Sequence, residues 1–322
     1  MKITLLDDYQ DVVRTFDRYA TIAQHDVTVW NDHSDDIDVL AQRLQDTEVL
    51  LLIRERTKIG AALLDRLPRL RLISQFGVTP HIDLEACTRR GVVVCSRSAP
   101  GQPSYATAEL TWGLIIAALR RIPQEVQALK MGRWQSPDSM GLLLRGRTLG
   151  VYGFGRIGGV VAGYGRAFGM KVQVWGRPST LARARADGWD VADSEQAFFE
   201  TSDVITLHLP LIPATRGIVS ANLLGKMKTD ALIVNTSRAE LIETGALESA
   251  LRAGRPGLGA VDVFEEEPLL GGAGHPLLAL PNLTATPHVG YVERTGLEKM
   301  FETIFEQIVA FERGEPINVL NR

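Results

Sequence analysis

The fold is decided by one stretch of the sequence, Thr148-Leu-Gly-Val-Tyr-Gly-Phe-Gly-Arg-Ile-Gly158. An apolar run at residues 149–152 leads into Gly153, Gly155 and Gly158, which have the G-x-G-x-x-G spacing, and a helical pattern follows. In such a strand–turn–helix the first glycine allows a tight turn, the second lets the backbone approach a pyrophosphate, and the third lets the helix pack on the strand. We therefore expect a dinucleotide to bind at the positive end of this helix.

Alternating strand and helix patterns extend on both sides of this stretch. Near-continuous apolar runs predict strands at residues 149–152, 172–175, 204–208, 232–235, 258–261 and 283–285. The first hundred residues repeat the pattern, with strands expected at 3–6, 27–30, 49–53, 70–73 and 92–95 and helices at 39–44, 61–67 and 84–90. Strands that are apolar throughout are typical of parallel sheets covered on both faces. We expect an α/β protein with two doubly wound domains, a Rossmann coenzyme domain and a flavodoxin-like substrate domain.

The length agrees with two domains, because 322 residues at about 150 per domain give roughly two. An apolar helical pattern over residues 104–134 predicts a long connecting helix. A second helical pattern, over residues 293–311, leaves the last strand of the second domain and is expected to return to the first. The expected substrate domain therefore comprises residues 1–100 and 290–322, and the expected dinucleotide-binding domain comprises residues 101–289.

Composition excludes several classes of protein. The chain has 35 Lys and Arg against 38 Asp and Glu, a net charge of −3, and so lacks the positive field that favours nucleic-acid binding. The most apolar run, residues 110–119, is about half the roughly 20 residues of a membrane helix. Two cysteines imply no disulfide framework, and acids at positions 7 and 8 interrupt any signal peptide. We expect a cytoplasmic protein that binds neither nucleic acid, nor membrane, nor metal.

The residues after the second strand of the coenzyme domain bear on the choice of coenzyme. An NAD site usually has a carboxylate about 20 residues beyond the glycine motif, where it binds the ribose hydroxyls. Here the strand is followed by Gly176-Arg177-Pro-Ser179-Thr180, which contains no acid. The Arg177 guanidinium can pair with a 2′-phosphate, and the Ser179 and Thr180 hydroxyls can donate to it. The pattern favours NADP(H); if Arg177 is only a solvated loop cation, NAD(H) is the alternative.

The order of the motifs resembles the D-isomer-specific 2-hydroxyacid dehydrogenase family, which includes phosphoglycerate dehydrogenases and glyoxylate/hydroxypyruvate reductases. The resemblance rests on the glycine loop and on five further motifs, Ala108-Glu-Leu, His208-Leu-Pro, Asn235-Thr-Ser-Arg238, Asp262-Val-Phe-Glu-Glu-Glu267-Pro and Thr286-Pro-His288-Val-Gly290. It implies an oxidoreductase that transfers a hydride between NADP(H), or alternatively NAD(H), and a small 2-oxo or D-2-hydroxy acid. It further implies that Arg238, Glu267 and His288 are the catalytic residues.

Chemistry supports the same three residues independently. Reduction of a 2-oxo acid needs a cation for the carboxylate and carbonyl, a proton donor, and a group that keeps the donor charged. Arg238 suits the first role, and His288 suits the second because histidine changes charge near neutral pH. Glu267 suits the third by accepting a hydrogen bond from the other imidazole nitrogen. In the oxidative direction neutral His288 is the expected base. The alternatives are a structural ion pair of Arg238 with Glu240 or Glu243 and a solvated acidic run at Glu267.

The resemblance implies further contacts, a homodimer formed through the coenzyme domain, and a rival function. The implied coenzyme contacts are Thr107, Asp262 and Gly290 near the nicotinamide, Arg156 near the pyrophosphate, and Ile157, His208, Leu209, Pro210, Thr215 and Thr236 elsewhere. The implied substrate contacts are Arg238, His288 and the amides of Gly77, Val78 and Thr79. These amides belong to a loop that departs from the family pattern, because it contains Pro80 and His81 and is one residue shorter. The rival function is that of a coenzyme-sensing binding protein of the corepressor type.

Overall fold

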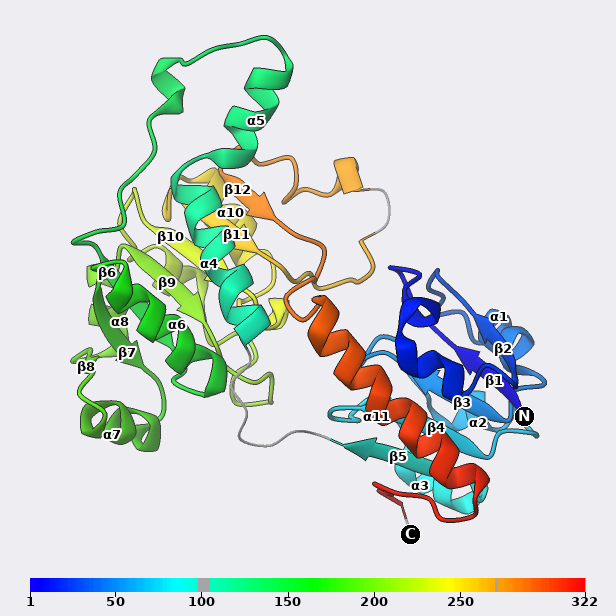
Figure 1. The fold of residues 1–322 in the computed structure, drawn as a ribbon. Coiled ribbons are helices and arrows are strands. Elements are labelled where there is room, and N and C mark those ends of the chain that lie inside the picture. The colour runs from blue at the N-terminus through cyan, green and yellow to red at the C-terminus, as the bar shows by residue number, and fades with distance from the viewer. Residues whose placement is uncertain (98–104, 270–271, 322) are drawn as a thin grey trace. The chain divides into compact units, whose positions relative to one another are not determined.

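The computed structural model describes residues 1–97, 105–269 and 272–321 (Figure 1). The chain forms two compact units, one made of Met1–Pro100 with Glu293–Arg322 and the other of Gly101–Val292. The second unit thus ends three residues later than the expected boundary at 289. Both units are α/β structures with parallel sheets, as expected from the apolar strand runs.

The second unit contains a seven-stranded parallel sheet in the order β12-β11-β10-β9-β6-β7-β8. Its strands are β6 (Thr148–Tyr152), β7 (Lys171–Trp175), β8 (Asp190–Val191), β9 (Val204–Leu207), β10 (Leu232–Asn235), β11 (Leu258–Val261) and β12 (Leu283–Ala285). Its helices are α4 (Tyr105–Leu119), α5 (Ile122–Lys130), α6 (Arg156–Ala167), α7 (Pro178–Ala186), α8 (Glu195–Thr201), α9 (Ala221–Leu224) and α10 (Ala246–Arg252), with short 3-10 turns at Pro137–Ser139, Ala239–Leu241 and Gly272–Gly274. This is the doubly wound Rossmann order, and its strand order reverses between β6 and β9.

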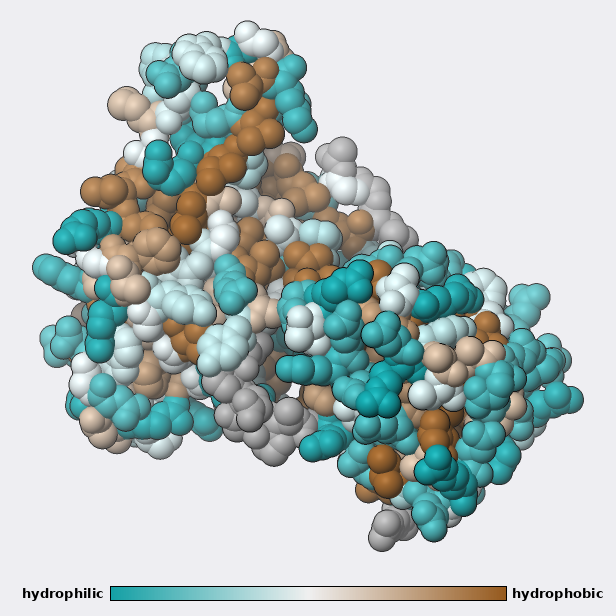
Figure 2. Space-filling view, in the orientation of Figure 1, coloured by the Kyte–Doolittle hydropathy of each residue, from teal (hydrophilic) through white to brown (hydrophobic). Residues whose placement is uncertain are grey.

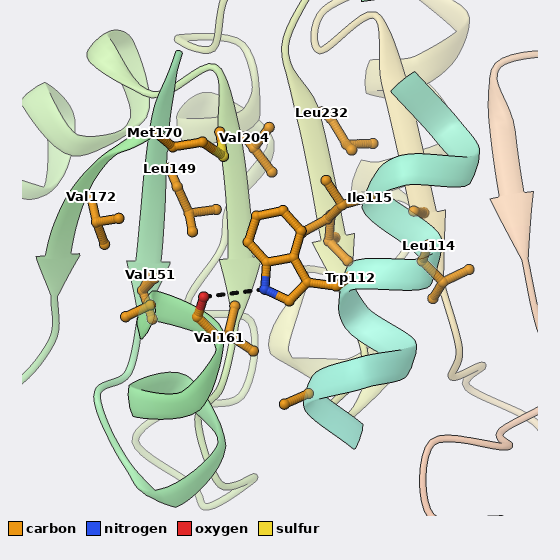
Figure 3. Close-up of a cluster of buried hydrophobic side chains, with 14 of the residues drawn as sticks. Trp112, Leu114, Ile115, Leu149, Val151, Val161, Met170, Val172, Val204 and Leu232 are labelled. Carbon is orange, nitrogen blue, oxygen red and sulfur yellow. Dashed lines mark hydrogen bonds between the residues drawn. The ribbon is translucent and has the colours of Figure 1, made fainter. Parts of the chain in front are cut away.

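The strands of this sheet separate two apolar clusters. Along β6, Leu149 and Val151 pack under α4 and α6, whereas Tyr152 packs on the opposite face with the helices α8, α9 and α10. Successive strand residues point to opposite faces, so strands covered on both sides need apolar residues throughout. Figure 3 shows Trp112 of α4 at the centre of the first cluster, where its indole N–H donates to the Val161 carbonyl oxygen at 3.2 Å.

The first two helices of the second unit correct one expectation. A single helix over residues 104–134 is wrong, because α4 ends at Leu119 and α5 begins at Ile122; residue 104 lies outside the described residues. Arg121 lies between them with a left-handed backbone (φ 54°), and Pro123 is in the first turn of α5. Proline has no N–H to donate to the preceding turn, and its ring clashes with that turn, so a continuous helix is excluded here.

The first unit contains a five-stranded parallel sheet in the order β2-β1-β3-β4-β5, the flavodoxin-like order that was expected. Its elements are β1 (Lys2–Leu5), β2 (Asp26–Val29), β3 (Val49–Leu52), β4 (Leu72–Phe76), β5 (Val93–Arg97), α1 (Ile37–Leu44), α2 (Ala61–Leu64), α3 (Leu84–Arg89), α11 (Arg294–Glu312) and two 3-10 turns at Val13–Thr15 and Asp17–Thr21. The returning helix α11 packs on this sheet, where the Ser74 hydroxyl of β4 donates to Gln307 Oε1 at 2.7 Å. Among the described residues, none of the helices has the length and apolar character needed to cross a membrane.

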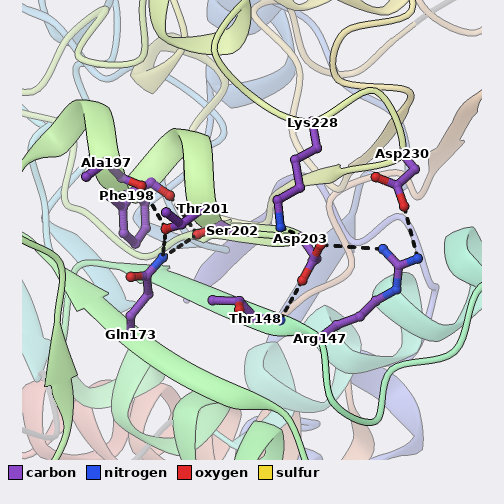
Figure 4. A network of polar contacts seen from close by, with 10 residues as sticks. All are labelled: Arg147, Thr148, Gln173, Ala197, Phe198, Thr201, Ser202, Asp203, Lys228 and Asp230. Atoms are coloured by element: carbon purple, nitrogen blue, oxygen red, sulfur yellow. Dashed lines mark hydrogen bonds and ion pairs between the residues drawn. The ribbon is translucent and has the colours of Figure 1, made fainter.

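A polar network joins three parts of the second unit at the amino-terminal edge of its sheet (Figure 4). The Asp203 carboxylate, just before β9, accepts from the Thr148 N–H at 2.7 Å and from the Lys228 ammonium at 2.8 Å. Arg147 lies 3.7 Å from the same carboxylate and donates to Asp230 at 3.0 Å. Burial favours the neutral acid, but the bonds from Lys228 and Thr148 outweigh it and lower the pKa of Asp203.

We expect the Asp203→Asn variant to lose about 1–3 kcal/mol of unfolding free energy near pH 7, because a partly buried set of donors loses its charged acceptor. Because the pKa of Asp203 is lower in the folded protein than in the unfolded chain, the carboxylate stabilises the fold at pH values above its unfolded-chain pKa of about 3.9. This stabilisation is lost as the pH falls through the pKa of Asp203 in the folded protein. Urea unfolding measures the free energy of unfolding of the wild type and of Asp203→Asn. We expect the difference between the two proteins to be smaller at about pH 3 than near pH 7. Asp230→Asn, with a half-exposed side chain, is the matched control and changes stability little. An equal loss at both pH values would contradict this account.

Candidate active site

The glycine loop of the second unit has the geometry of a phosphate cradle. Gly153 follows β6 with φ 96°, and a Cβ atom on Gly158 would lie 2.1 Å from the Gly153 carbonyl oxygen, so both positions require glycine. At Gly155, the N-cap of α6, a Cβ atom would meet nothing within 4 Å, and no side chain caps the helix. The 12-residue helix that begins at Arg156 therefore presents its N-terminal amides and positive dipole over open space, as a bound pyrophosphate requires. Arg156 and Ile157 are in its first turn.

The end of β7 lies beside this loop. A Cβ atom on Gly176 would be 3.9 Å from the Gly153 nitrogen, so the structure brings the predicted ribose-binding segment next to the predicted phosphate-binding loop. Arg177 is the N-cap of α7 and is exposed, while Ser179 and Thr180 are in the first turn of the helix. The first acid after β7 is Asp187, at the far end of α7.

The segment after β9 lies at the carboxyl-terminal edge of the sheet, where the strand order reverses between β6 and β9. The His208 N–H donates to the Tyr152 carbonyl oxygen at 2.8 Å, and a Cβ atom on Gly153 would be 3.0 Å from the Leu209 side chain. The Thr215 hydroxyl donates to the Pro210 carbonyl oxygen at 2.6 Å and so closes the loop. Burial lowers the pKa of His208 to about 3, which favours the neutral imidazole.

Two of the three predicted catalytic side chains are in direct contact. The His288 Nδ1 and Glu267 Oε2 atoms are 2.5 Å apart, and the other carboxylate oxygen of Glu267 accepts from the Phe264 N–H at 2.8 Å. Burial of Glu267 favours the neutral acid, but the hydrogen bond and charge of His288 and the charge of Arg238 outweigh it and lower the pKa of Glu267. Glu267 is therefore a carboxylate at neutral pH, and it orients an imidazole that is one third exposed.

Arg238 follows β10 in a turn that the predicted motif holds in place. The Asn235 side-chain amide donates to the Arg238 carbonyl oxygen at 2.8 Å, and Asn235 Oδ1 accepts from the Ser237 N–H at 3.0 Å. The two acids considered as structural partners have other contacts. Glu240 lies 3.7 Å from Arg216, and Glu243 accepts from the backbone of α9 at 3.0 Å.

The residues assigned to the nicotinamide region are joined by hydroxyl groups. The Thr107 hydroxyl donates to the Gly290 carbonyl oxygen at 3.0 Å. Thr111, one helical turn further along α4, donates to the Thr107 carbonyl oxygen at 2.7 Å, and its oxygen lies 2.8 Å from the Thr236 hydroxyl oxygen. Sequence reasoning missed Thr111, although its i+4 spacing from Thr107 on a helix was a usable signal. Asp262 accepts from the Gly290 N–H at 2.8 Å, and burial raises the pKa of Asp262.

The three predicted substrate amides belong to the other unit. Gly77, with φ 114°, follows β4 and donates its N–H to the Arg97 carbonyl oxygen at 3.1 Å. This amide has a partner next to the sheet, and the contact of Gly77, Val78 and Thr79 with the substrate stays a prediction. The Val78 carbonyl oxygen accepts from the Gln75 side chain at 2.7 Å, which fixes the loop. Within the described part of the chain, no group of three or more His, Cys, Asp or Glu side chains is arranged to hold a metal ion.

Comparison with known proteins identifies the family. Residues 112–290 match the model described as the NAD-binding domain of D-isomer specific 2-hydroxyacid dehydrogenases. The chain belongs to this family. The dehydrogenase is 37% identical over 309 residues to a glyoxylate reductase of Aeropyrum pernix, with 92% of this chain and 90% of that protein covered. It is 38% identical over 284 residues to a D-3-phosphoglycerate dehydrogenase of Methanocaldococcus jannaschii, covering 88% of this chain but only 53% of that longer protein.

A solved structure shows the same fold over nearly the whole dehydrogenase. The phosphoglycerate oxidoreductase of Vibrio cholerae is 46% identical and superimposes with a TM-score of 0.92, covering 98% of this chain and 99% of that one. The expectations of a Rossmann coenzyme domain and of an NAD(P)-dependent D-2-hydroxyacid dehydrogenase are confirmed. The family acts on small 2-oxo and 2-hydroxy acids with a nicotinamide coenzyme.

Two glycines of this dehydrogenase offer a matched test of the cradle. We expect Gly155→Ala to lower coenzyme affinity at least tenfold, because the new methyl group meets no protein atom but occupies the space of the pyrophosphate. Gly159→Ala, in the same helix and also with open space, is expected to leave affinity unchanged. Both variants are expected to keep the wild-type unfolding free energy to within about 1 kcal/mol. Coenzyme titration by fluorescence, with urea unfolding alongside, measures both quantities, and equal affinities of the two variants would contradict the assignment.

Proposed function

We propose that the enzyme reduces a small 2-oxo acid with NADPH, with His288 as proton donor, Glu267 as the group that keeps the donor charged, and Arg238 as the binding site of the substrate carboxylate. The observation that carries the proposal is the 2.5 Å contact between His288 Nδ1 and Glu267 Oε2 in the unit that contains the glycine cradle. A carboxylate bonded to one ring nitrogen favours the imidazolium form and leaves the other nitrogen to donate.

The open cradle at Gly155 fits a coenzyme pyrophosphate, and when bound the reduced nicotinamide supplies the hydride that adds to the carbonyl carbon. His288 Nε2 donates its proton to the carbonyl oxygen as that oxygen gains the electron pair of the C=O bond, and the product is a 2-hydroxy acid. Arg238 offers a planar set of N–H donors that neutralises the substrate carboxylate. In the reverse direction neutral His288 takes the hydroxyl proton, and Glu267 stabilises the imidazolium that forms.

We expect His288→Ala to lower kcat by roughly 10²- to 10⁴-fold, which is the usual contribution of a general acid, while the dissociation constant of the coenzyme changes less than about twofold. His275→Ala is the matched control, because this histidine is in the same unit, accepts from the Leu277 N–H at 3.3 Å and packs edge-on against the Phe264 ring. Its kcat is expected to equal that of the wild type. Steady-state assays of coenzyme oxidation with glyoxylate, hydroxypyruvate and pyruvate provide the measurement. Retained turnover in His288→Ala would remove the proton-donor role.

The segment after β7 supports NADPH over NADH. The absence of an acid between Gly176 and Asp187 removes the charge that repels a 2′-phosphate, and exposed Arg177 stands at the N-terminus of the nine-residue helix α7. A guanidinium and a helix N-terminus both favour a doubly charged phosphate. The alternative, an NAD(H)-dependent enzyme, requires that Arg177 bind only water.

Arg177→Ala is expected to lower kcat/KM for NADPH roughly 10- to 100-fold, the value of one charge-assisted hydrogen bond, and to leave kcat/KM for NADH unchanged. Arg185→Ala, in the last turn of the same helix, is the control and should change neither value. Both coenzymes are compared with one saturating 2-oxo acid. A wild-type preference for NADH would overturn the NADP(H) assignment.

The coenzyme unit also carries an apolar surface that fits a homodimer. Around α5 and the following segment, several large apolar side chains are exposed by 45–81%: Ile122, Val126, Leu129, Met131, Trp134, Met140 and Leu143. Figure 2 shows brown, apolar side chains along α5. Apolar patches of this kind are rare on monomers and mark interfaces, and a second copy in twofold symmetry is the commonest partner.

Sedimentation at micromolar concentration is expected to give a mass twice the 35.3 kDa of one chain. A double variant, Leu129→Glu with Trp134→Glu, is expected to sediment as a monomer, because charges cannot be buried in the apolar contact. Ile317→Glu, an exposed apolar residue of the other unit, is the control and remains dimeric. A monomeric wild-type protein would rule out the homodimer.

A further inference from the structure

A buried carboxylate anchors the segment that carries His288. The Val289 N–H donates to Asp262 Oδ1 at 2.9 Å, and the Gly290 N–H donates to Asp262 Oδ2 at 2.8 Å. The Thr286 hydroxyl donates to Asp262 Oδ1 at 2.6 Å. Asp262 is 1% exposed, so these donors replace the water that the carboxylate loses on burial. Three hydrogen bonds from five consecutive residues therefore converge on one side chain.

Thr286 is anchored to β11 and its end by two bonds, because its N–H donates to the Val261 carbonyl oxygen at 3.0 Å and its hydroxyl donates to Asp262. Pro287 has no N–H, and the His288 N–H donates to the Thr286 carbonyl oxygen at 3.1 Å. On the side before His288, the hydroxyl is therefore the bond to the Asp262 side chain, and it adds to the backbone bond with Val261. The two amides that follow His288 join the chain after it. His288 is clamped from both sides.

The backbone at His288 explains why both clamps matter. Its φ of 52° lies in the left-handed region, which is unfavourable for a residue with a Cβ atom. Such a conformation persists where the surrounding contacts impose it. The same conformation directs the imidazole to Glu267, whose oxygen is 2.5 Å from Nδ1. Without the hydroxyl bond, only the backbone bond to Val261 holds the Thr286 side, so we expect the turn to relax and the ring to move away from Glu267.

We propose that Thr286 is a positioning residue for the reaction, because its hydrogen bond to Asp262 holds the 286–290 turn and with it the His288 imidazole against Glu267. The proposal rests on the proton-donor role proposed above for His288. Thr286 acts through Asp262 and exchanges no proton with the substrate. The charged groups that act on the imidazole and its partner are Glu267, Asp262 and Arg238.

The test compares Thr286→Val, which keeps the shape and removes the hydroxyl, with Thr286→Ser, which keeps the hydroxyl. We expect Thr286→Val to lower kcat for 2-oxo acid reduction roughly 10- to 100-fold, the usual cost of a misplaced catalytic group, while the KM for the coenzyme changes less than about twofold. The pH at which reduction falls to half its maximum is expected to move to lower pH, because the carboxylate of Glu267 supports the imidazolium less well. Thr286→Ser is expected to restore both kcat and the pH profile.

Wild-type kcat and pH dependence in Thr286→Val would overturn the proposal. So would a proportional loss of coenzyme affinity with an unchanged pH profile, since that outcome assigns Thr286 to the coenzyme site. If Thr286→Val unfolds, judged by circular dichroism, Thr286→Ala is measured in its place against the same criteria. His288→Ala is assayed in parallel: its loss of turnover beside an unaffected Thr286→Val overturns this proposal alone, whereas retained turnover in His288→Ala overturns the proposed function and this proposal together.

Discussion

The arrangement of the coenzyme unit depends on one buried carboxylate. Asp262 receives three hydrogen bonds from the segment after β12, and its own N–H donates to the Asn235 carbonyl oxygen at the end of β10. A charge in an apolar interior is tolerated only when donors surround it, so these contacts fix the ends of β10, β11 and β12 together. Gly290 in turn accepts from Thr107, which ties α4 to the same cluster.

Parallel strands supply the frame for this cluster. All seven strands of the unit run in the same direction, so the segments that leave their carboxyl ends meet at one edge. The glycine loop after β6, Gly176 after β7, His208 after β9, Arg238 after β10 and Asp262 after β11 therefore share an edge, although 109 residues of sequence separate Gly153 from Asp262 (262 − 153). The strand order therefore brings the predicted coenzyme-binding residues and the predicted acid–base residues to one edge of the sheet.

Most of this frame could be predicted because each buried strand is a continuous apolar run. The two-residue strand β8 has no such run, since Asp190 is exposed and Val191 half-buried, and it was missed. The break between α4 and α5 was also missed, because helical periodicity continues past Pro123 while the helix cannot. The glycine spacing predicted the turn between β6 and α6, and the motif around Glu267 and His288 predicted the contact between these two side chains.

The parts that sequence reasoning missed depend on tertiary contacts. The i+4 spacing indicated that Thr107 and Thr111 share a helix face, but no local pattern reports the contact of Thr111 with Thr236 or that of Thr286 with Asp262. The bond from the Gly77 N–H to the Arg97 carbonyl oxygen likewise depends on the pairing of β4 with β5, which no local pattern reports. A threonine hydroxyl or a backbone amide can bond to many groups, and its actual hydrogen-bond partner is fixed only by the folded structure.

The central claim is that the Glu267 carboxylate keeps His288 charged for proton donation. Single-turnover oxidation of the coenzyme, followed by absorbance across the pH range in the wild type and in Glu267→Gln, tests it most directly. The account predicts that the pH limit of rapid reduction moves to lower pH in the variant, while coenzyme affinity stays the same. A Glu267→Gln enzyme with the wild-type rate and pH profile would contradict it.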